Sequence, residues 1–332
     1  MPNRASTLLL TRRDILEVMH PEDYLDAVET AFRLAGEGRV DAAPVVDVPG
    51  DGGAFHIKAA GTRGSKRYVA VKVNGNFAEN GRRFGLPTIQ GVIVLADGEN
   101  GSPLALLDSI EITSARTAAA TALAARYLAR PESAVLTLCG CGAQAAAQIQ
   151  ALRRVLPLKQ VFTFDLDPER ARRAASLAAT EPGIEAAPVS NLQDAARKSD
   201  VIVTCTTSRK PFLADDDVPR GAFVAAVGAD AHDKRELHSE LLSRAKLVVD
   251  VLEQCAAIGE LHHALQEGFL SREGVHAELG DLVRGAKPGR TDPSERIVFD
   301  STGTAIQDVA SAILAYERAR ERGIGRSFEL SA

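Results

Sequence analysis

One short stretch, Ser133–Ala145 (SAVLTLCGCGAQA), constrains the fold of this chain more than any other feature. It opens with an apolar run over residues 134–139 that is bounded by Pro131 and Gly140. Such a run is too short for a helix, and between two breakers it is typical of a buried parallel strand. The sequence therefore predicts a strand here, followed by a sharp turn.

The glycines of that turn have the spacing of a phosphate-binding loop. Gly140 and Gly142 would let the backbone turn tightly and approach a pyrophosphate, and a helix that begins at Ala143 would point its free N–H groups at the phosphates. Ala145 is the third small residue, so the pattern is G-x-G-x-x-A. A plain glycine turn can share this pattern, so its meaning depends on the residues that follow.

The next apolar run supplies that context. Gln160–Phe164 ends in Asp165, 23 residues beyond Gly142, close to the ~20 expected for an acid that binds the ribose of a dinucleotide. A carboxylate there accepts hydrogen bonds from the ribose hydroxyls and repels a 2′-phosphate. NAD is therefore the expected cofactor. NADP is less favoured but stays open, because Arg170 or Arg172 could reach a phosphate.

The rest of the chain divides into two kinds of pattern. Residues 11–38 have helical spacing, and residues 43–107 alternate β-branched runs with glycine-rich turns, as in an antiparallel sheet. A helix is expected over 110–130, and after it strands and helices alternate as in a doubly wound sheet. The expected fold class is α/β, with a central Rossmann domain and an α+β N-terminal domain. The later strands are expected at Glu185–Val189, Asp200–Thr206, Ala222–Gly228, Lys246–Val251 and Arg296–Asp300, and the later helices at Pro168–Ala179, Asn191–Lys198 and 303–322.

The composition narrows the partners and the location. A net charge of −5 over 332 residues argues against nucleic acid or an anionic membrane as a partner. There is no run of 18 apolar residues, and Leu8–Leu10 is too short for the core of a signal peptide, so a cytoplasmic location is expected. The four cysteines form neither a C-x-x-C pair nor a disulfide framework, and no metal is expected.

Strict alternation along two strands of the N-terminal half sorts their side chains into faces. Val69 and Val73 share one face of a strand, as Phe55 and Ile57 do on the preceding strand, and we expect these faces to form the core. Lys72 and Lys58 then lie on the opposite, polar faces. Between residues 52 and 78 there is no Asp or Glu, while several side chains are basic. This cationic stretch is either a solvated sheet edge protected by lysines or a site for a carboxylate or another small anion.

Two polar segments follow predicted buried strands. Asp230, in VGAD, comes at the carboxyl end of one, where doubly wound proteins bind ligands. An Asp after Gly is also a common turn or cap residue. Ser301–Gly303 follows the last strand and could cap the final helix or approach the cofactor.

A series of motifs resembles the ornithine cyclodeaminase/mu-crystallin family from about residue 10 to about residue 326. The motifs are GLPTIQG (85–91), PLALLD (103–108), ITSARTAAATALAARYLA (112–129), the G-x-G-x-x-A turn, VGAD with KREL, and FDSTGTAIQD (299–308) with a final AYERARERGIG. The resemblance implies a substrate-binding and dimerisation domain over residues 1–117, completed by residues 304–332. It also implies a Rossmann NAD-binding domain over 118–303, and a homodimer.

The resemblance further implies roles for individual residues. Lys72 and Arg116 match the pair that holds the substrate carboxylate, and Thr88 matches a residue that lines the nicotinamide and the substrate. Asp230 matches the acid/base residue, and Lys72 and Asp230 are the catalytic pair that we expect. The positions that match cofactor contacts are Thr117, Gly140, Gly142, Ala143, Gln144, Asp165, Thr302 and Gly303.

The activity implied by the resemblance is hydride transfer at the α-carbon of an amino or imino acid by an NAD(H)-dependent oxidoreductase. Family members that act on ornithine carry an Arg where this chain reads APVVDV (43–48), and an acid where FHIKAA has Lys58. A cation at Lys58 would repel the distal ammonium of ornithine, which favours a substrate with a neutral or acidic side chain, although Lys58 could also replace the missing Arg. An ornithine cyclodeaminase, which forms proline and ammonia, and a non-catalytic mu-crystallin-like binding protein are the alternatives.

Overall fold

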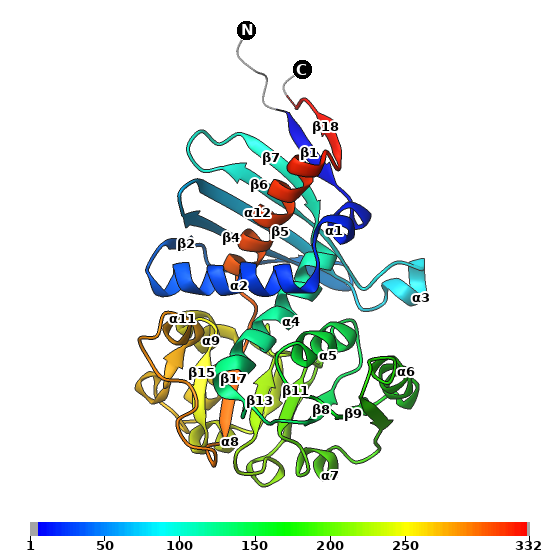
Figure 1. The fold of residues 1–332 in the computed structure, drawn as a ribbon, viewed down its shortest axis with the longest axis vertical. Helices are drawn as coiled ribbons and strands as arrows, with labels where there is room; N and C mark the ends of the chain where they lie inside the picture. Colours follow the sequence, from blue (N-terminus) through cyan, green and yellow to red (C-terminus); the bar gives the residue numbers. More distant parts are fainter. Residues whose placement is uncertain (1–5, 331–332) are drawn as a thin grey trace. The chain divides into compact units, whose positions relative to one another are not determined.

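The computed structural model describes residues 6–330, and this part of the chain forms two compact units (Figure 1). The first unit runs to Arg116 and takes up the chain again from Thr304, and the second comprises Thr117–Gly303. Helix α4 (Ser109–Leu128) begins in the first unit and ends in the second. The first and the last residues that the structure describes therefore belong to one unit.

The first unit is built on a mixed sheet. Its strand order is β18-β1-β7-β6-β5-β4-β2, and β3 also pairs with β4. The pairs among β2 to β7 are antiparallel, as predicted, while β1 runs parallel to β7. The strands are β1 (Thr7–Leu10), β2 (Val40–Ala42), β3 (Val46–Gly50), β4 (Gly53–Arg63), β5 (Arg67–Asn76), β6 (Ile89–Asp97), β7 (Pro103–Asp108) and β18 (Arg326–Phe328).

Helix α12 (Ala305–Arg322) crosses this sheet (Figure 1). It packs against β4, β5 and α2. The Tyr68 hydroxyl of β5 donates a hydrogen bond to the Glu317 carboxylate at 3.0 Å, and Arg318 forms an ion pair with Asp23 of α2. The last helix is thereby joined to the first third of the chain. The other helices of this unit are α1 (Arg12–Val18), α2 (Pro21–Gly36) and α3 (Asn80–Phe84).

The helical segment predicted over residues 11–38 is two helices rather than one. Helix α1 ends with extended backbone at Met19, and α2 begins at Pro21 after an extended His20. The proline ring disfavours helical backbone at the residue before it and removes one N–H donor, so the chain cannot continue α1 through this point.

The alternation along β5 is as predicted, but the face that is covered is the opposite one. Lys72 is only 3% exposed and lies with Ala70 on the side that packs against α12, whereas Val69 is 36% exposed. The prediction that the valine face forms the core was therefore wrong. A period of two sorts side chains into faces, but it does not tell which face a helix from far along the chain will cover.

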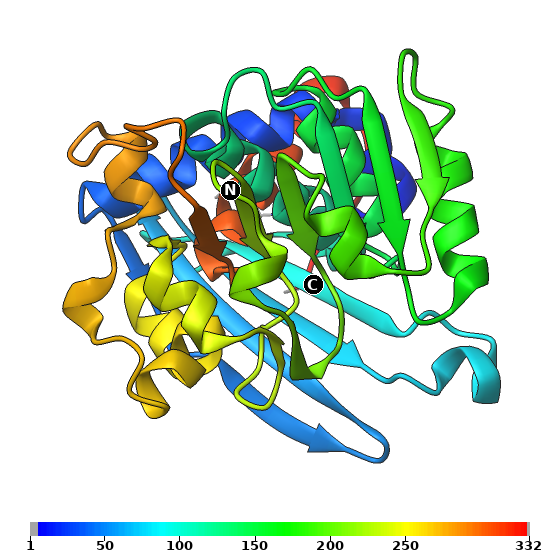
Figure 2. The same cartoon turned by 90° about the horizontal axis from the view of Figure 1, so that it is seen from below.

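The second unit holds a parallel sheet with the order β10-β9-β8-β11-β13-β17-β15-β16 (Figure 2). Each pairing in this sheet is parallel. The predicted Rossmann architecture and the α/β fold class are confirmed. The strands are β8 (Val135–Cys139), β9 (Gln160–Phe164), β10 (Glu185–Pro188), β11 (Val201–Thr204), β13 (Phe223–Ala226), β15 (Lys246–Val249), β16 (Ala277–Glu278) and β17 (Ile297–Asp300).

The connections of the second unit are short helices and one small additional sheet. The helices are α5 (Ala145–Arg153), α6 (Pro168–Ala178), α7 (Leu192–Ala196), α8 (Ser239–Arg244), α9 (Leu252–Ile258), α10 (Glu260–Gln266) and α11 (Leu279–Val283), with 3-10 turns η1 (Asp215–Asp217) and η2 (Arg272–Gly274). The small sheet pairs β12 (Arg209–Leu213) with β14 (Arg235–Leu237). Within residues 6–330, no helix is long and apolar enough to cross a membrane.

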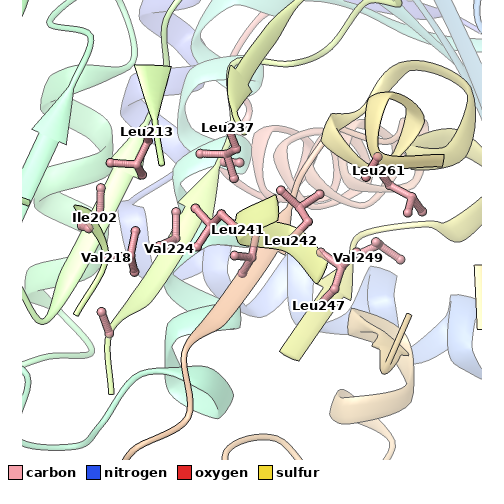
Figure 3. Packing of buried hydrophobic residues seen from close by; sticks show 14 of the residues in the cluster. Ile202, Leu213, Val218, Val224, Leu237, Leu241, Leu242, Leu247, Val249 and Leu261 are labelled. Atoms are coloured by element: carbon pink, nitrogen blue, oxygen red, sulfur yellow. The ribbon is translucent and has the colours of Figure 1, made fainter. Parts of the chain in front are cut away.

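A buried apolar cluster packs against β11, β13, β15 and β17 of the parallel sheet (Figure 3). Ile202 of β11 and Val224 of β13 pack in it with Leu241 of α8, and all three side chains are inaccessible to solvent. Because these strands are covered by well-packed side chains, their carboxyl ends are fixed relative to one another. The loops that leave those ends carry the polar residues described next.

Candidate active site

A cavity of about 910 Å³ opens at the carboxyl ends of β8, β9 and β11. Gly140, Gly142 and Asp165, three of the residues predicted to contact the cofactor, line it together. Thr206 and neighbouring residues of the loop after β11 line it as well. This is the edge of a parallel sheet at which doubly wound proteins bind ligands.

The glycine turn leaves room for a ligand at one position and brings two loops together at the other. Gly140 has φ +97°, and a Cβ there would lie 2.7 Å from the carbonyl oxygen of Cys205. A Cβ on Gly142 would meet no atom within 4 Å. Helix α5 begins at Ala145, two residues later than predicted, so Ala143 and Gln144 belong to the turn before it.

Asp165 is held at the cavity by backbone N–H groups. One carboxylate oxygen accepts a hydrogen bond from the N–H of Cys141 at 2.7 Å, and the other accepts from the N–H of Asp167 at 2.9 Å. Arg170 also lines the cavity, whereas Arg172 forms an ion pair with Glu169.

Ala143 and Gln144, in the glycine turn, are not among the residues that line the cavity, and three further residues predicted to contact the cofactor also lie outside the lining. The N–H groups of Thr302 and Gly303 both donate to the buried carboxylate of Asp250 at 2.8 Å. Thr117 is buried in α4. The structure brings the glycine turn and Asp165 together, but it does not bring these three residues to the same cavity.

In the first unit, the predicted carboxylate-binding residues form a buried charge cluster. The Nζ atom of Lys72 lies 2.6 Å from the carboxylate of Asp308, and the Nε atom of Arg116 lies 2.9 Å from the other oxygen of that carboxylate. Arg116 also donates to the side-chain oxygen of Gln307 at 2.7 Å. Lys58, which is buried as well, is the direct cross-strand neighbour of Lys72.

Cations dominate the electrostatic environment of this cluster. The pKa of Lys72 is lowered to about 7, because the effects of burial, which is the largest cause, and of Arg116 and Lys58 together outweigh the attraction of Asp308. Burial acts to raise the pKa of Asp308, but Arg116 and Lys72 outweigh it and hold that pKa below its usual value. The side-chain nitrogen of Gln307 has no hydrogen-bond partner among the described residues. A carboxylate of a ligand would supply both the negative charge and the acceptor.

The cationic stretch over residues 52–78 therefore divides in two. At the far end of β4 and β5, Arg63 and Arg67 both form ion pairs with Asp41, and Lys66 pairs with Asp97, all at the surface. Arg63, Lys66 and Arg67 therefore belong to a solvated sheet edge. Lys58 and Lys72 are buried, and the interpretation as an anion site applies to them.

Sequence reasoning did not identify Gln307 and Asp308 as site residues. A signal was present: Asp308 lies three residues after Ala305 and four before Ala312, both buried, so it falls on the apolar face of α12. An acid on an otherwise apolar helical face requires a buried cation as a partner.

Thr88 and Asp230 lie outside both the cluster and the cavity lining. Thr88 is exposed just before β6, and its carbonyl oxygen accepts a hydrogen bond from the N–H of Phe77 at 2.8 Å. Asp230 lies in the loop after β13 and forms an ion pair with Lys234 at 2.5 Å, with half of its side chain exposed. Among the described residues, no group of three or more His, Cys, Asp or Glu could hold a metal ion.

Known proteins are similar to this chain over almost its whole length. Residues 5–323 match the profile of the ornithine cyclodeaminase/mu-crystallin family. The chain belongs to this family. The alanine dehydrogenase of Archaeoglobus fulgidus is 39% identical over 319 residues, which are 96% of this chain and 97% of that protein.

Two solved structures of family relatives show the same fold. An archaeal alanine dehydrogenase dimer with bound NAD is 38% identical, with a TM-score of 0.93 over 98% of this chain and 99% of that one. The Δ1-pyrroline-2-carboxylate reductase of Thermococcus litoralis, in complex with NADH and L-proline, is 32% identical, with a TM-score of 0.92 over 96% and 99% of the two chains. Relatives of this chain thus include dehydrogenases and reductases crystallised with NAD or NADH.

Loss of the Asp308 charge should destabilise the first unit. Asp308→Asn leaves Lys72 and Arg116 buried without their carboxylate, and we expect the free energy of unfolding to fall by about 3–5 kcal/mol. Glu317→Gln, on the exposed side of the same helix, should cost only about 1 kcal/mol. Urea unfolding measures both values, and equal losses in the two variants would contradict the account.

Lys72 should make the protein more stable as the pH rises. Its pKa is about 7 in the folded chain and about 10.4 in an unfolded chain. The unfolded state therefore binds more protons between these values, and the free energy of unfolding increases from about pH 7 to about pH 10. Lys72→Met removes the titrating group and should lack this part of the increase in urea unfolding at several pH values. An unchanged pH dependence in that variant would show that Lys72 does not titrate as described.

Proposed function

We propose that this protein is an NAD(H)-dependent oxidoreductase that reduces imino acids or oxidises amino acids at the α-carbon. The observation that carries the proposal is the buried group in which Lys72 and Arg116 both contact the carboxylate of Asp308, with Lys58 buried as the cross-strand neighbour of Lys72. Such a cluster suits a small ligand with a carboxylate group. Relatives that act on alanine, or that bind L-proline with NADH, support the same class of substrate.

The residues at the cavity of the second unit fit NAD(H). Gly142 has open space where a Cβ would stand, as a backbone that approaches a pyrophosphate requires. Asp165 offers carboxylate oxygens to ribose hydroxyls and disfavours a 2′-phosphate, so NAD is proposed over NADP. When bound, the cofactor would supply the hydride chemistry, and the protein supplies the binding geometry and the charges.

We assign residues of this chain to the carboxylate and to the nitrogen of the substrate. Lys72 and Arg116 would bind the α-carboxylate and so fix the orientation of the α-carbon, which can contribute several kcal/mol to the rate. Asp230 would take or give the proton at the substrate nitrogen, and Lys72, with a pKa of about 7, can also exchange a proton near neutral pH. Thr88 is proposed to line the substrate, and Thr117, Ala143, Gln144, Thr302 and Gly303 to contact the cofactor.

Lys58 bears on the side chain of the substrate. A buried cation beside Lys72 repels an ammonium group and attracts a carboxylate, so a neutral or acidic side chain is favoured over that of ornithine. Ornithine cyclodeamination, and binding without catalysis, are the competing activities.

The activity can be tested with a panel of substrates. We expect NADH oxidation with 2-oxo acids plus ammonia or methylamine, or with cyclic imino acids, and slower oxidation of NADPH. Asp230→Asn should lower kcat by about 100-fold or more, because a general acid/base contributes roughly 10²–10⁴-fold. Proline release from ornithine without net NADH change would overturn the proposal in favour of a cyclodeaminase. Failure of the whole panel, with normal NADH binding, would favour a binding protein.

A homodimer is also proposed, through the open face of the first sheet. Val46, Ile57, Val73 and Val92 are successive cross-strand neighbours on β3 to β6, so they form one apolar row on that face. Val46 is 51% and Val92 43% exposed. An exposed apolar row of this kind marks a surface for association, and the archaeal alanine dehydrogenase relative is a dimer.

A cytoplasmic location is part of the proposal, because the four cysteines are unpaired and thiols stay reduced there.

Charges on the apolar row should separate the subunits. We expect a wild-type dimer in light scattering after size exclusion, and a monomer for the double variant Val46→Glu with Val92→Glu. Leu177→Glu, at an exposed position on α6, is the matched control and should stay dimeric. A double variant that remains dimeric would exclude this face as the interface.

A further inference from the structure

Glu236, in β14 of the second unit, is a completely buried carboxylate that accepts hydrogen bonds from two separate loops. One oxygen accepts from the backbone N–H of Thr206 at 2.7 Å. The other accepts from the N–H of Gly228 at 2.9 Å and from the hydroxyl of Thr204 at 2.7 Å. Two of the three partners are backbone N–H groups, which can only donate, and they contact different oxygens, so the site requires an acceptor at both side-chain positions.

The Glu236 carboxylate leaves no room for a side chain at position 228. A Cβ on that residue would lie 2.5 Å from a carboxylate oxygen of Glu236 and 2.4 Å from the carbonyl oxygen of Thr206. These distances are too short for any side chain, so the loop after β13 can approach Glu236 and the loop after β11 only because a glycine stands there. The three segments are packed as one assembly.

The two loops that Glu236 holds carry different parts of the proposed site. The loop after β11 contributes Thr206, Thr207 and Ser208 to the lining of the nucleotide cavity. The loop after β13 carries Asp230, whose N–H donates to the carbonyl of Gly228 at 3.1 Å. Because β14 follows this second loop directly, Glu236 also joins the end of the loop to its beginning.

A second buried acid holds the backbone that carries Glu236. The carboxylate of Glu260, at the start of α10, accepts from the N–H of Glu236 at 2.6 Å and from the N–H of Leu237 at 3.1 Å. The position of the Glu236 side chain is thereby fixed from the strand side.

We propose that Glu236 is a positioning residue that holds the Asp230 loop in register with the loop lining the nucleotide cavity. This inference rests on the proposed function. Glu236 touches neither substrate nor cofactor, and it acts through the backbone at Thr206 and Gly228. Loss of the Glu236 carboxylate should slow the chemical step and speed the hydrogen–deuterium exchange of the backbone in these two loops. The binding of the substrate carboxylate by the first unit should stay unchanged.

The test compares Glu236→Gln with Thr204→Val. The amide of the first variant would direct its NH2 group at the N–H of either Thr206 or Gly228, so one backbone donor loses its acceptor. The second variant removes only the hydroxyl donor and leaves both backbone contacts. We expect Glu236→Gln to lower kcat by about 10- to 100-fold, with the KM of the amino or imino acid within twofold of the wild-type value. Thr204→Val should keep a wild-type kcat.

Hydrogen–deuterium exchange makes the test independent of turnover. Residues 205–208 and 228–234 should exchange faster in Glu236→Gln than in Thr204→Val. Gly228→Ala, which pushes on the same carboxylate from the other side, should show the same pattern. If Glu236→Gln and Thr204→Val match in kcat and in exchange, the positioning role is wrong. If the wild-type protein binds no NADH, the proposed function fails, and the exchange data still decide the role of Glu236.

Discussion

The ion pairs of Asp308 with Lys72 and Arg116 are the interaction on which the first unit depends. They join β5, α4 and α12, three elements from distant parts of the sequence, at a point that solvent does not reach. Two buried cations without a carboxylate would be strongly unfavourable. The return of the chain from Thr304 to the first unit is therefore a physical requirement as well as a matter of topology.

The same contact bears on the proposed binding of a substrate carboxylate by this unit. Asp308 fixes both cations in place, and Lys58 lies beside Lys72 as its cross-strand neighbour. The proposed carboxylate site is thus ordered before any ligand arrives. In the second unit, the proposed functional side chains are acids rather than cations. Asp165 and Asp230 lie at the carboxyl ends of its parallel strands, on loops that backbone hydrogen bonds hold in place.

Much of the second unit could be predicted from the sequence because its signals are local. The glycine turn, Asp165 and the apolar strands lie close together along the chain, and each predicted strand is present within two residues of its expected ends. In the first unit, the faces of β5 were assigned the wrong way round, because α12 decides which face is buried. Asp308 was missed for the same reason: its partners are on β5 and α4, and alternation along a strand carries no information about them.

The most direct test of the account is to follow the hydride. NADH carrying deuterium at both hydrogen positions of C4 would be incubated with the protein and the imino acid that performs best, and the product analysed by mass spectrometry and NMR. We predict deuterium at the α-carbon of an amino acid, in an amount equal to the NADH oxidised. Oxidation of NADH without deuterium at that carbon would contradict the claim that the carboxylate cluster orients an α-carbon for hydride transfer.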